Sequence, residues 1–430
     1  MKHQTRIILA GTLGNLIESF DMAICGLLSV YIAKYLIGDA PKGLFLVFLT
    51  FFAGYLARPI GAMIMGLLSD IYGRKIILAV SILAMGISTT LIGFIPPQST
   101  LGTFSVISLL TLRVIQSFSC GAEYLNSSAY LMENAEISRK GYSGSWASFG
   151  AMSGMLVASM IALIVTYFTN HYPEQDWLIW RVPFVLALLG SSIGLYIRLC
   201  IPESMEYIMY YADRPKPKFG NLLTESFCYI KANKLQSLYV FVLSCLGVTT
   251  TFQIYIYGPI QAGLYGSFSK HEIILSNIIS LTVLLCVFPI IGRLSDKINR
   301  EKIVIAASIG FLLLSQSFFY MLSYGNFHQL VFAQVLIAIP AGAYYATVPV
   351  MLAEMFPIKL RCSVLSVLYS IAASLSAGLA PLVSLILVKR TSVASSPSWL
   401  VFILVFAVLA CMYIKYFKCK NDNAIATPIS

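Results

Sequence analysis

Long apolar segments recur along the whole chain, and short polar segments separate them. A membrane-spanning helix needs roughly 20 consecutive, mostly apolar residues, and twelve segments qualify. The polar segments between them are too short to fold as soluble domains, which contain about 50 residues or more. The pattern therefore predicts an all-α integral membrane protein with twelve transmembrane helices, at residues 9–36, 44–68, 76–95, 103–132, 143–168, 180–200, 237–262, 272–292, 303–324, 330–353, 363–388 and 399–416.

The composition excludes a water-soluble enzyme. Charged residues make up only 11% of the 430 residues, whereas soluble domains carry about 25%. The first apolar segment contains Glu18 and Asp21 but no small-residue cleavage site, so we expect a retained helix rather than a signal peptide. The nine cysteines lie within predicted helices or on the predicted inner side, and no CxxC or HExxH pattern occurs. We therefore expect no disulfide, no metal site and no cofactor.

The net charge of +11 is unevenly distributed. With the N-terminus inside, 21 of the 29 Lys and Arg residues fall on the inner side, six fall outside, and Arg58 and Arg113 fall within helices. Cytoplasmic loops of membrane proteins carry such an excess. We therefore expect both termini in the cytoplasm, and the basic excess requires no nucleic-acid partner.

The longest polar segment divides the chain into two sets of six predicted helices. The predicted organisation is an N-terminal six-helix half over 1–200, a cytoplasmic central loop over 201–236, a C-terminal six-helix half over 237–416 and a cytoplasmic tail over 417–430.

Charged motifs repeat between the two halves. Asp70 and Arg74 follow predicted helix 2, and Asp296 and Arg300 follow predicted helix 8, with 226 residues between the two aspartates. A second repeat relates the loops after helices 4 and 10, which contain Glu133 with Arg139 and Glu354 with Arg361. Internal duplication is typical of transporters, whose substrate site lies between the repeats near the membrane midplane.

Several motifs resemble the major facilitator superfamily, and its metabolite:proton symporter branch in particular. Residues 66–75 read Gly-x-x-x-Asp-x-x-Gly-Arg-Lys, which is characteristic of the superfamily. The branch includes proline/betaine, α-ketoglutarate, citrate and shikimate carriers. It is indicated by Gly14-Asn15 with Glu18 and Phe20-Asp21, Arg58-Pro59-x-Gly61, Arg113-x-x-Gln116, Gly121-x-Glu123 and Tyr130-Leu131-x-Glu133.

The resemblance is dense over residues 11–145 and thinner afterwards. Aromatic residues of the family are replaced by Ser19, Met22 and Cys25, and glycines by Ser117 and Ala122. The substrate of one family member therefore does not transfer to this chain. The resemblance implies the major facilitator fold and import of a small organic acid or zwitterion together with protons, by alternating access.

Five ionisable residues fall within predicted helices of the N-terminal half: Glu18, Asp21, Arg58, Arg113 and Glu123. A charge at the membrane centre costs about 2.5–3.5 kcal/mol on insertion scales, so such residues face the bundle interior or a water-filled cavity. Fully ionised, these five carry a net charge of −1, which one proton would neutralise.

A buried carboxylate is the expected proton carrier, because no histidine falls within a predicted helix and burial disfavours the charged form of a carboxylate. We rank Asp21 first, Glu123 second and Glu18 third. The alternative is that these residues form fixed ion pairs that join helices 1, 2 and 4. Sodium in place of protons also stays open.

Two kinds of residue are candidates for substrate binding. Arg58 and Arg113 could each hold a substrate carboxylate bidentately, unless Arg58 already pairs with Glu18 or Asp21 and Arg113 with Glu123. In the C-terminal half the candidates are neutral, namely Gln253, Tyr257 and Tyr344. The alternative for this neutral set is hydrogen bonding between helices, worth about 0.6 kcal/mol on average.

The repeated loop charges predict a gate. Asp70 and Asp296 can accept hydrogen bonds from a facing helix terminus, and Arg74 and Arg300 can bridge to Glu133 and Glu354. The resemblance implies that such clusters close the cytoplasmic gate in the outward-facing state. The alternative, ordinary positive-inside loops, explains the arginines but not the repeated acids. The full predicted gating set is Asp70, Arg74, Glu133, Arg139, Asp296, Arg300, Glu354 and Arg361.

The sequence thus predicts a secondary transporter in the bacterial cytoplasmic (inner) membrane, not an enzyme. No Gly-x-x-x-x-Gly-Lys-Ser/Thr loop is present for ATP. The expected partners are the substrate, protons and the lipid bilayer, and the expected state is a monomer. A proton-coupled exporter of drugs or metabolites and a solute sensor that does not transport are the alternatives.

Overall fold

The computed structural model describes residues 2–38 and 40–426 as a helical bundle. Within that part of the chain, twelve helices are long and apolar enough to cross a membrane. Each overlaps one of the predicted segments, so the predicted fold class is confirmed. Of the predicted tail, residues 427–430 lie outside the described residues.

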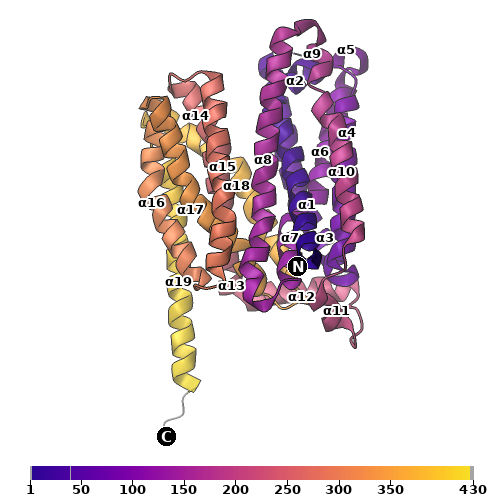
Figure 1. The fold of residues 1–430 in the computed structure, drawn as a ribbon, viewed down its shortest axis with the longest axis vertical. Helices are drawn as coiled ribbons and strands as arrows, with labels where there is room; N and C mark the ends of the chain where they lie inside the picture. The colour runs from indigo at the N-terminus through magenta and orange to yellow at the C-terminus, as the bar shows by residue number, and fades with distance from the viewer. Residues whose placement is uncertain (1, 39, 427–430) are drawn as a thin grey trace.

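The N-terminal half, on the right in Figure 1, contains six of these spans. They are formed by α1 (Lys2–Leu27), α3 (Ala40–Tyr72), α4 (Arg74–Phe94), α6 (Thr103–Ser119) with α7 (Glu123–Glu133), α8 (Lys140–His171) and α10 (Val182–Cys200). Short helices α2 (Ser29–Ile32), α5 (Gln98–Leu101) and α9 (Asp176–Ile179) lie at the upper end of this half (Figure 1).

The C-terminal half contains the other six spans. They are formed by α13 (Lys234–Phe252) with α14 (Gly258–Tyr265), α15 (Lys270–Ser295), α16 (Arg300–Tyr324), α17 (Phe327–Glu354), α18 (Arg361–Thr391) and α19 (Ser398–Ala426). The halves pack on each other through α8 against α15 and α3 against α18.

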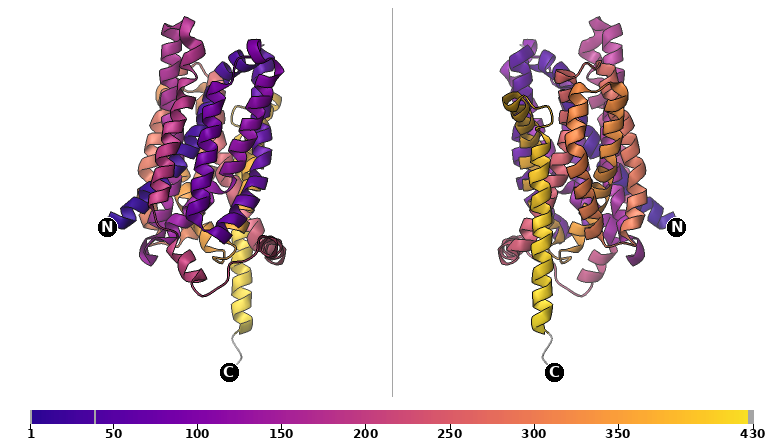
Figure 2. Two further views of the ribbon diagram at one scale, coloured as in Figure 1. Left: turned by 90° about the vertical axis from the view of Figure 1, so that its right-hand side faces the viewer. Right: turned by 90° about the vertical axis from the view of Figure 1, so that its left-hand side faces the viewer.

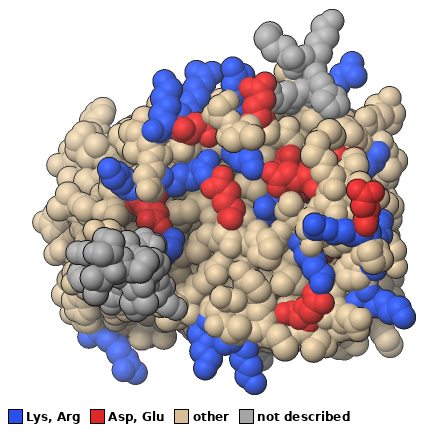
Figure 3. Space-filling view, turned by 90° about the horizontal axis from the view of Figure 1, so that it is seen from below, with Lys and Arg blue, Asp and Glu red and all other residues tan. Residues whose placement is uncertain are grey.

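Two short helices, α11 (Met205–Tyr211) and α12 (Phe219–Ala232), link the halves at the lower end of the bundle. The lower end is the end at which α1 begins and α19 finishes (Figure 1). Helix α12 lies across the bundle axis there, horizontally in Figure 1 and nearly end-on in Figure 2. Seen from below in Figure 3, the lower end carries many Lys and Arg side chains with acidic side chains among them.

Two spans are interrupted near their middle. A 3-10 turn at Cys120–Ala122 separates α6 from α7, and a π-helical turn at Gln253–Tyr257 separates α13 from α14. The first turn lies against α3, because a Cβ added at Gly121 would lie 2.4 Å from the Ala62 nitrogen. π-helical turns inside α-helices are frequent at functional sites. Both interruptions therefore favour a functional site in the middle of the bundle.

Candidate functional site

The first buried ion pair of the N-terminal half joins α1 to α3. The Arg58 Nη2 donates to Glu18 Oε1 over 3.0 Å, and both side chains are buried. Of the two partners considered for Arg58 from the sequence, the structure therefore shows Glu18. A carboxylate held by a guanidinium in this way forms a charge-assisted hydrogen bond.

The second buried ion pair involves one of the 21 Lys and Arg residues that the sequence analysis counted on the inner side. Arg198, near the end of α10, is 1% exposed and pairs with Glu123, which also accepts from Ser81 of α4. Arg198 is thus part of the buried charge cluster, and Glu123 pairs with Arg198 rather than with Arg113 as considered above. The only indication of this contact in the sequence was Gly14 of the family motif, a position without a side chain that leaves space for the Arg198 guanidinium. A Cβ there would lie 1.9 Å from Arg198 Nη2.

The third carboxylate, Asp21, is fully buried and sits at one end of a chain of hydrogen bonds. Thr89 of α4 donates to Asp21 Oδ2 over 3.0 Å, and Gln116 Nε2 donates to the Thr89 hydroxyl over 2.7 Å. Arg113 Nη1 in turn donates to Gln116 Oε1 over 2.7 Å, and its charge acts on Asp21. The other carboxylate oxygen, Oδ1, has no hydrogen-bond partner in the described part of the chain.

Arg198 changes the charge balance expected from the sequence. The cluster contains three carboxylates and three guanidinium groups, so its fully ionised sum is zero rather than −1. The two ion pairs are also neighbours, because Glu18 interacts electrostatically with Glu123 and Arg198. Net charge alone therefore does not identify the proton carrier. The hydrogen-bond and ion-pair partners of each acid distinguish the three candidates.

Gln253 and Tyr257 of the π-helical turn lie inside the C-terminal half. Gln253 Nε2 donates to Ser384 Oγ over 2.9 Å and to the Pro397 carbonyl over 3.1 Å. Tyr257 is 1% exposed and packs on Phe319 at 6.3 Å between ring centroids. These contacts favour the interhelical role that the sequence analysis left open for them.

Tyr344 is also an interior residue of the C-terminal half. Its hydroxyl donates to the Leu243 carbonyl over 2.8 Å, and its ring packs on Phe311. The next residue, Tyr345, donates to Thr250 over 3.0 Å, and its carbonyl accepts from Ser148 of the other half over 2.6 Å. The neighbour of Tyr344, rather than Tyr344 itself, therefore contacts the N-terminal half.

Two aromatic contacts join the halves near the Glu18–Arg58 pair. Tyr55 of α3 meets Phe252 of α13 edge to face, with centroids 6.1 Å apart. Tyr124 of α7 meets Tyr369 of α18 with centroids 5.5 Å apart. All four side chains are half-buried. The sequence analysis did not select them, because tyrosines are frequent in this chain and only the fold brings these four together.

The predicted gate acid Asp70 contacts the beginning of α18. Its carboxylate accepts from the backbone N–H of Ser363 over 2.8 Å, from the Ser363 hydroxyl over 2.6 Å and from the N–H of Cys362 over 3.3 Å. Asp296 makes the matching contact in the other half, where it accepts from the N–H groups of Gly141 and Tyr142 over 2.6 and 2.9 Å. In each case a carboxylate from one half caps a helix N-terminus of the other, where the helix dipole favours an anion.

Arginines extend the Asp70 contact into a network. Arg74 pairs with Asp70 and Glu133, each over 3.2 Å. Glu133 also pairs with Arg361 of the C-terminal half over 2.7 Å, and Arg361 reaches Glu206 over 3.0 Å. We call these residues, with Ser363, the lower gate: Asp70, Arg74, Glu133, Glu206, Arg361 and Ser363.

An aromatic ring supports the lower gate from outside the membrane. The guanidinium of Arg74 lies 4.9 Å from the ring centroid of Tyr207 in α11, whose hydroxyl donates to the Ile71 carbonyl over 2.6 Å. Burial raises the pKa of Tyr207 to about 12, so the ring stays neutral. A neutral ring face attracts the guanidinium without competing for its ion pairs.

The remaining predicted gate residues separate into two groups. Arg300 contacts Asp296 over 3.7 Å and also pairs with Glu354, so these three lie together. Arg139 instead pairs with Glu136 over 3.5 Å, and both side chains are 62% exposed. The structure therefore does not bring Arg139 into either acid–arginine cluster.

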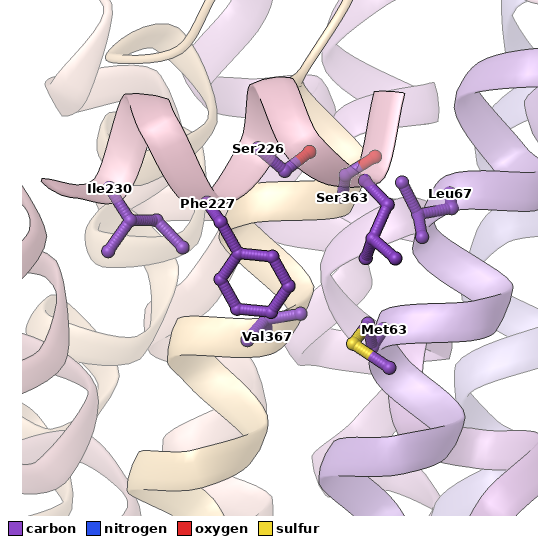
Figure 4. A pocket seen from close by; sticks show the side chains of 8 residues that line it. Met63, Leu67, Ser226, Phe227, Ile230, Ser363 and Val367 are labelled. Atoms are coloured by element: carbon purple, nitrogen blue, oxygen red, sulfur yellow. The ribbon is translucent and has the colours of Figure 1, made fainter. Parts of the chain in front are cut away.

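Helix α12 covers the lower gate on one side. A small pocket lies between α12, α3 and α18, next to Ser363, and Figure 4 shows Phe227 and Ile230 of α12 directed toward α18. Met63 of α3 and Val367 of α18 line the same pocket (Figure 4). Because α12 packs on both halves beside the Asp70–Ser363 contact, it must shift or separate when the halves part at this end.

Four serine hydroxyls of α18 continue the contact between the halves upward from the gate. They are spaced at three or four residues, which places them on one helix face. The serines and their partners are Ser363 with Asp70, Ser366 with Asn126, Ser370 with the Gly121 carbonyl, and Ser374 with the Tyr55 carbonyl. Polar contacts between the halves thus run from the lower end to the level of Tyr55.

Comparison with known proteins agrees with this architecture. Residues 12–215 match the family model for sugar (and other) transporters, and residues 241–426 match the model for the major facilitator superfamily. The chain is 29% identical over 423 residues to the proline/betaine transporter of Escherichia coli, and the match covers 94% of this chain and 81% of the relative. It is 29% identical over 416 residues to the glycine betaine/proline/ectoine/pipecolic acid transporter of Dickeya dadantii, again covering 94% and 81%.

Two solved structures show the same fold at low sequence identity. A proton:xylose symporter bound to 6-bromo-6-deoxy-D-glucose superposes with a TM-score of 0.76 at 17% identity, over 97% of this chain and 96% of the other. A partially occluded, inward-open form of the xylose transporter from E. coli gives a TM-score of 0.67 at 18% identity, over 97% and 98%.

Proposed function

This chain belongs to the major facilitator superfamily of transporters, and we propose that it imports a small zwitterion or organic acid together with protons by alternating access, with Asp21 as the proton carrier. The observation that carries the proposal is the difference between the three buried acids. Glu18 and Glu123 each contact a guanidinium, whereas the hydrogen bond to Asp21 comes from the neutral Thr89 hydroxyl.

Protonation has different consequences at the three positions. Adding a proton to Glu18 or Glu123 leaves a buried guanidinium without its counter-ion, which is strongly unfavourable. A protonated Asp21 can keep its Thr89 hydrogen bond through Oδ2 and carry the proton on Oδ1, which has no partner within the described residues. Asp21 can therefore load and release a proton with the smallest disturbance to its surroundings.

The conformation supports entry from the upper side. The lower gate joins the halves through charge-assisted hydrogen bonds and ion pairs, which must break before the lower end can open. We assign the lower end, rich in Lys and Arg (Figure 3), to the cytoplasm by the positive-inside rule.

The order of steps in alternating access follows from the contacts that are present in each conformation. Substrate and a proton enter from the upper side while the lower gate is closed. Protonation of Asp21 changes the charge sum of the cluster from zero to +1, and a bound substrate carboxylate offsets that change. Because unpaired buried charge is unfavourable, the carrier separates Asp70 from α18 only when proton and substrate are both bound or both absent. Proton release on the lower side restores the Asp21 charge and favours the return.

The cargo chemistry follows from Arg58 and from the relatives. A carboxylate on the substrate can share the Arg58 guanidinium with Glu18, because a guanidinium offers five N–H donors. The relatives described above are named as transporters of proline, betaine, ectoine and pipecolic acid. We extend this chemistry to the present chain as import of a small zwitterion by a monomeric carrier of the bacterial inner membrane that catalyses no chemical reaction.

The proposal is tested in proteoliposomes that contain a pH-sensitive dye. Addition of proline or glycine betaine outside should acidify the interior of vesicles with wild-type protein. Asp21→Asn should abolish the acidification, and the matched control Glu136→Gln, an exposed acid, should retain it. Solute uptake without acidification by the wild-type protein would overturn proton coupling.

A further inference from the structure

The hydrogen bonds that end at Asp21 all run in one direction. Arg113 can only donate, because a guanidinium has no acceptor, so the Gln116 amide turns its oxygen toward Arg113 Nη1. The amide nitrogen of Gln116 therefore faces Thr89 and donates to its hydroxyl oxygen. The Thr89 hydroxyl in turn donates to Asp21 Oδ2. One guanidinium thus determines the direction of three successive hydrogen bonds.

This direction favours the ionised form of Asp21. A protonated Asp21 that carries its proton on Oδ1 keeps the hydrogen bond from Thr89. A carboxylate, however, accepts a stronger hydrogen bond than a neutral carboxyl group does. A hydrogen bond that favours the charged form of an acid also favours release of its proton. The chain of hydrogen bonds therefore opposes burial, which favours the neutral acid.

Several charged groups of the cluster are already paired with one another. Glu18, on the same helix as Asp21, pairs with Arg58 of α3. Glu123 of α7 and Arg198 of α10 form the second pair. Each pair is neutral as a unit, so neither supplies Asp21 with a counter-charge of its own.

The remaining helices around Asp21 bring one charged residue to this level. The membrane-embedded parts of α4 and α8, residues 76–94 and 141–170, contain no Asp, Glu, Lys, Arg or His. Arg113 is the only charged residue of α6, and it interacts electrostatically with Asp21. Cys25, one turn further along α1, is a thiol that is mostly protonated near neutral pH. Arg113 is therefore the counter-charge that these helices offer to Asp21, and the chain of hydrogen bonds connects the two.

We propose that Thr89 and Gln116 are positioning residues that connect Arg113 to Asp21 and set the pH at which Asp21 takes up and releases its proton. This inference rests on the proposed function and identifies the residues that adjust its proton carrier. It gives Arg113 the role of orienting the chain, which differs from the substrate role considered for it from the sequence.

The chain lies within one half of the transporter. Its members belong to α1, α4 and α6, which are all helices of the N-terminal half. Alternating access moves the two halves largely as rigid bodies, so these hydrogen bonds persist when the lower gate opens. The chain therefore adjusts the proton affinity of Asp21 in both conformations, and the conformation decides from which side the proton arrives.

The test follows the protonation of Asp21 directly, by infrared difference spectroscopy of the purified protein at a series of pH values. The C=O stretching band of protonated Asp21 is identified as the band that Asp21→Asn removes. Thr89→Val keeps a side chain of similar shape without the hydroxyl. It should move the midpoint of this band to higher pH by about one unit, because the lost hydrogen bond favoured the charged form.

Two control variants separate the hydroxyl from packing. Thr89→Ser restores a hydroxyl and should titrate within about 0.3 pH unit of wild type. Thr90→Val makes the same change at the next residue, whose hydroxyl donates to the Gly86 carbonyl of its own helix over 2.7 Å, and it should leave the midpoint unchanged. Equal midpoints in wild type and Thr89→Val would overturn the role of Thr89, and so would an equal shift in Thr90→Val.

Gln116 provides a second position if a Thr89 variant fails to fold, and thermal unfolding checks folding. Gln116→Met removes both amide hydrogen bonds and should also move the midpoint to higher pH, because the Thr89 hydroxyl is no longer oriented toward Asp21. The double variant Thr89→Val/Gln116→Met should shift no further than the larger single shift, since both changes interrupt one chain. Shifts that add would show independent effects and would overturn the chain.

Failure of this inference is distinguishable from failure of the proposed function. If the midpoints respond as expected but solute uptake moves no protons into vesicles, the chain stands and proton coupling is refuted. If uptake moves protons but wild type, Thr89→Val and Gln116→Met titrate alike, the chain is refuted and proton coupling stands. If Asp21→Asn removes no band at any pH at which the protein is folded, both are overturned.

Discussion

Gly14 provides the space through which Arg198 reaches Glu123. A Cβ at Gly14 would lie 1.9 Å from Arg198 Nη2, so no larger residue fits without displacing the guanidinium. The buried ion pair between α7 and α10 therefore depends on a glycine in a third helix, α1. This relationship explains a glycine of the family motif by packing rather than by backbone conformation.

The first prediction compares two glycines of the same helix. Gly14→Ala should displace Arg198 and lower the thermal unfolding temperature and the transport rate. Gly26→Ala should do neither, because a Cβ at Gly26 meets nothing within 4 Å. Alanine favours the helix over glycine by about 0.8–1.0 kcal/mol at both positions. The change in helix propensity is therefore the same in the two variants and does not affect their comparison. Equal unfolding temperatures for both variants would contradict the packing role.

The second prediction separates structural pairing from coupling at Glu123. Arg198→Gln leaves a buried carboxylate without its counter-ion and should destabilise the protein by about 3–5 kcal/mol. The double variant Glu123→Gln/Arg198→Gln removes both charges and should recover most of that loss in thermal unfolding. If the recovered protein also accumulates substrate, Glu123 is a structural partner; if it is folded but inactive, Glu123 takes part in transport.

The third prediction concerns the Asp70 contact. Asp70→Asn replaces charge-assisted hydrogen bonds with neutral ones, which are roughly half as strong, so the lower end should open more often. In a protein that retains Cys362 as its only cysteine, thiol alkylation should become faster, because this thiol is buried at the gate. Transport should fall several-fold with normal membrane insertion. Full transport by well-expressed Asp70→Asn protein would refute the gate.

A matched control accompanies the alkylation measurement. A protein that retains only Cys245, which is buried inside the C-terminal half, should react at the same rate whether or not it also carries the Asp70→Asn substitution. A parallel increase at both cysteines would indicate general loosening rather than gate opening.

The fourth prediction compares two arginines that the sequence analysis treated alike. Arg361 pairs with Glu133 across the halves, whereas Arg139 pairs with Glu136 at an exposed position. Arg361→Gln should reduce initial uptake several-fold. Arg139→Gln should leave uptake within about twofold, since exposed ion pairs contribute about 0–1 kcal/mol. Equal losses in both variants would remove the distinction between them.

Much of the fold followed from the sequence because membrane helices are long and continuous. Twelve apolar segments and a repeated loop motif determine the number of spans and the division into halves. The loop aspartates were also predictable, because a carboxylate placed opposite a helix N-terminus has a clear electrostatic role. The sequence did not show which helix termini donate to Asp70 and Asp296; in the structure each terminus belongs to the half opposite its aspartate.

The site was less predictable, for three physical reasons. Arg198 lies near a helix end, where the sequence pattern cannot distinguish an inner-flank arginine from one that turns into the bundle. A regular helical period does not give the face of Gln253, because a π-helical turn occurs at Gln253–Tyr257 and changes the rotation per residue. Contacts such as Tyr124 with Tyr369 also depend on how the two halves dock, which no single helix pattern encodes.

The most direct test of proton coupling compares two transport modes of the Asp21→Asn variant. Asparagine resembles the protonated acid but cannot release a proton. The variant should therefore exchange labelled substrate across the vesicle membrane at a rate close to that of wild type, and it should fail to accumulate substrate under an imposed pH gradient. Retained exchange with lost accumulation is the predicted result. Accumulation by Asp21→Asn equal to that of wild type would contradict proton transfer through Asp21.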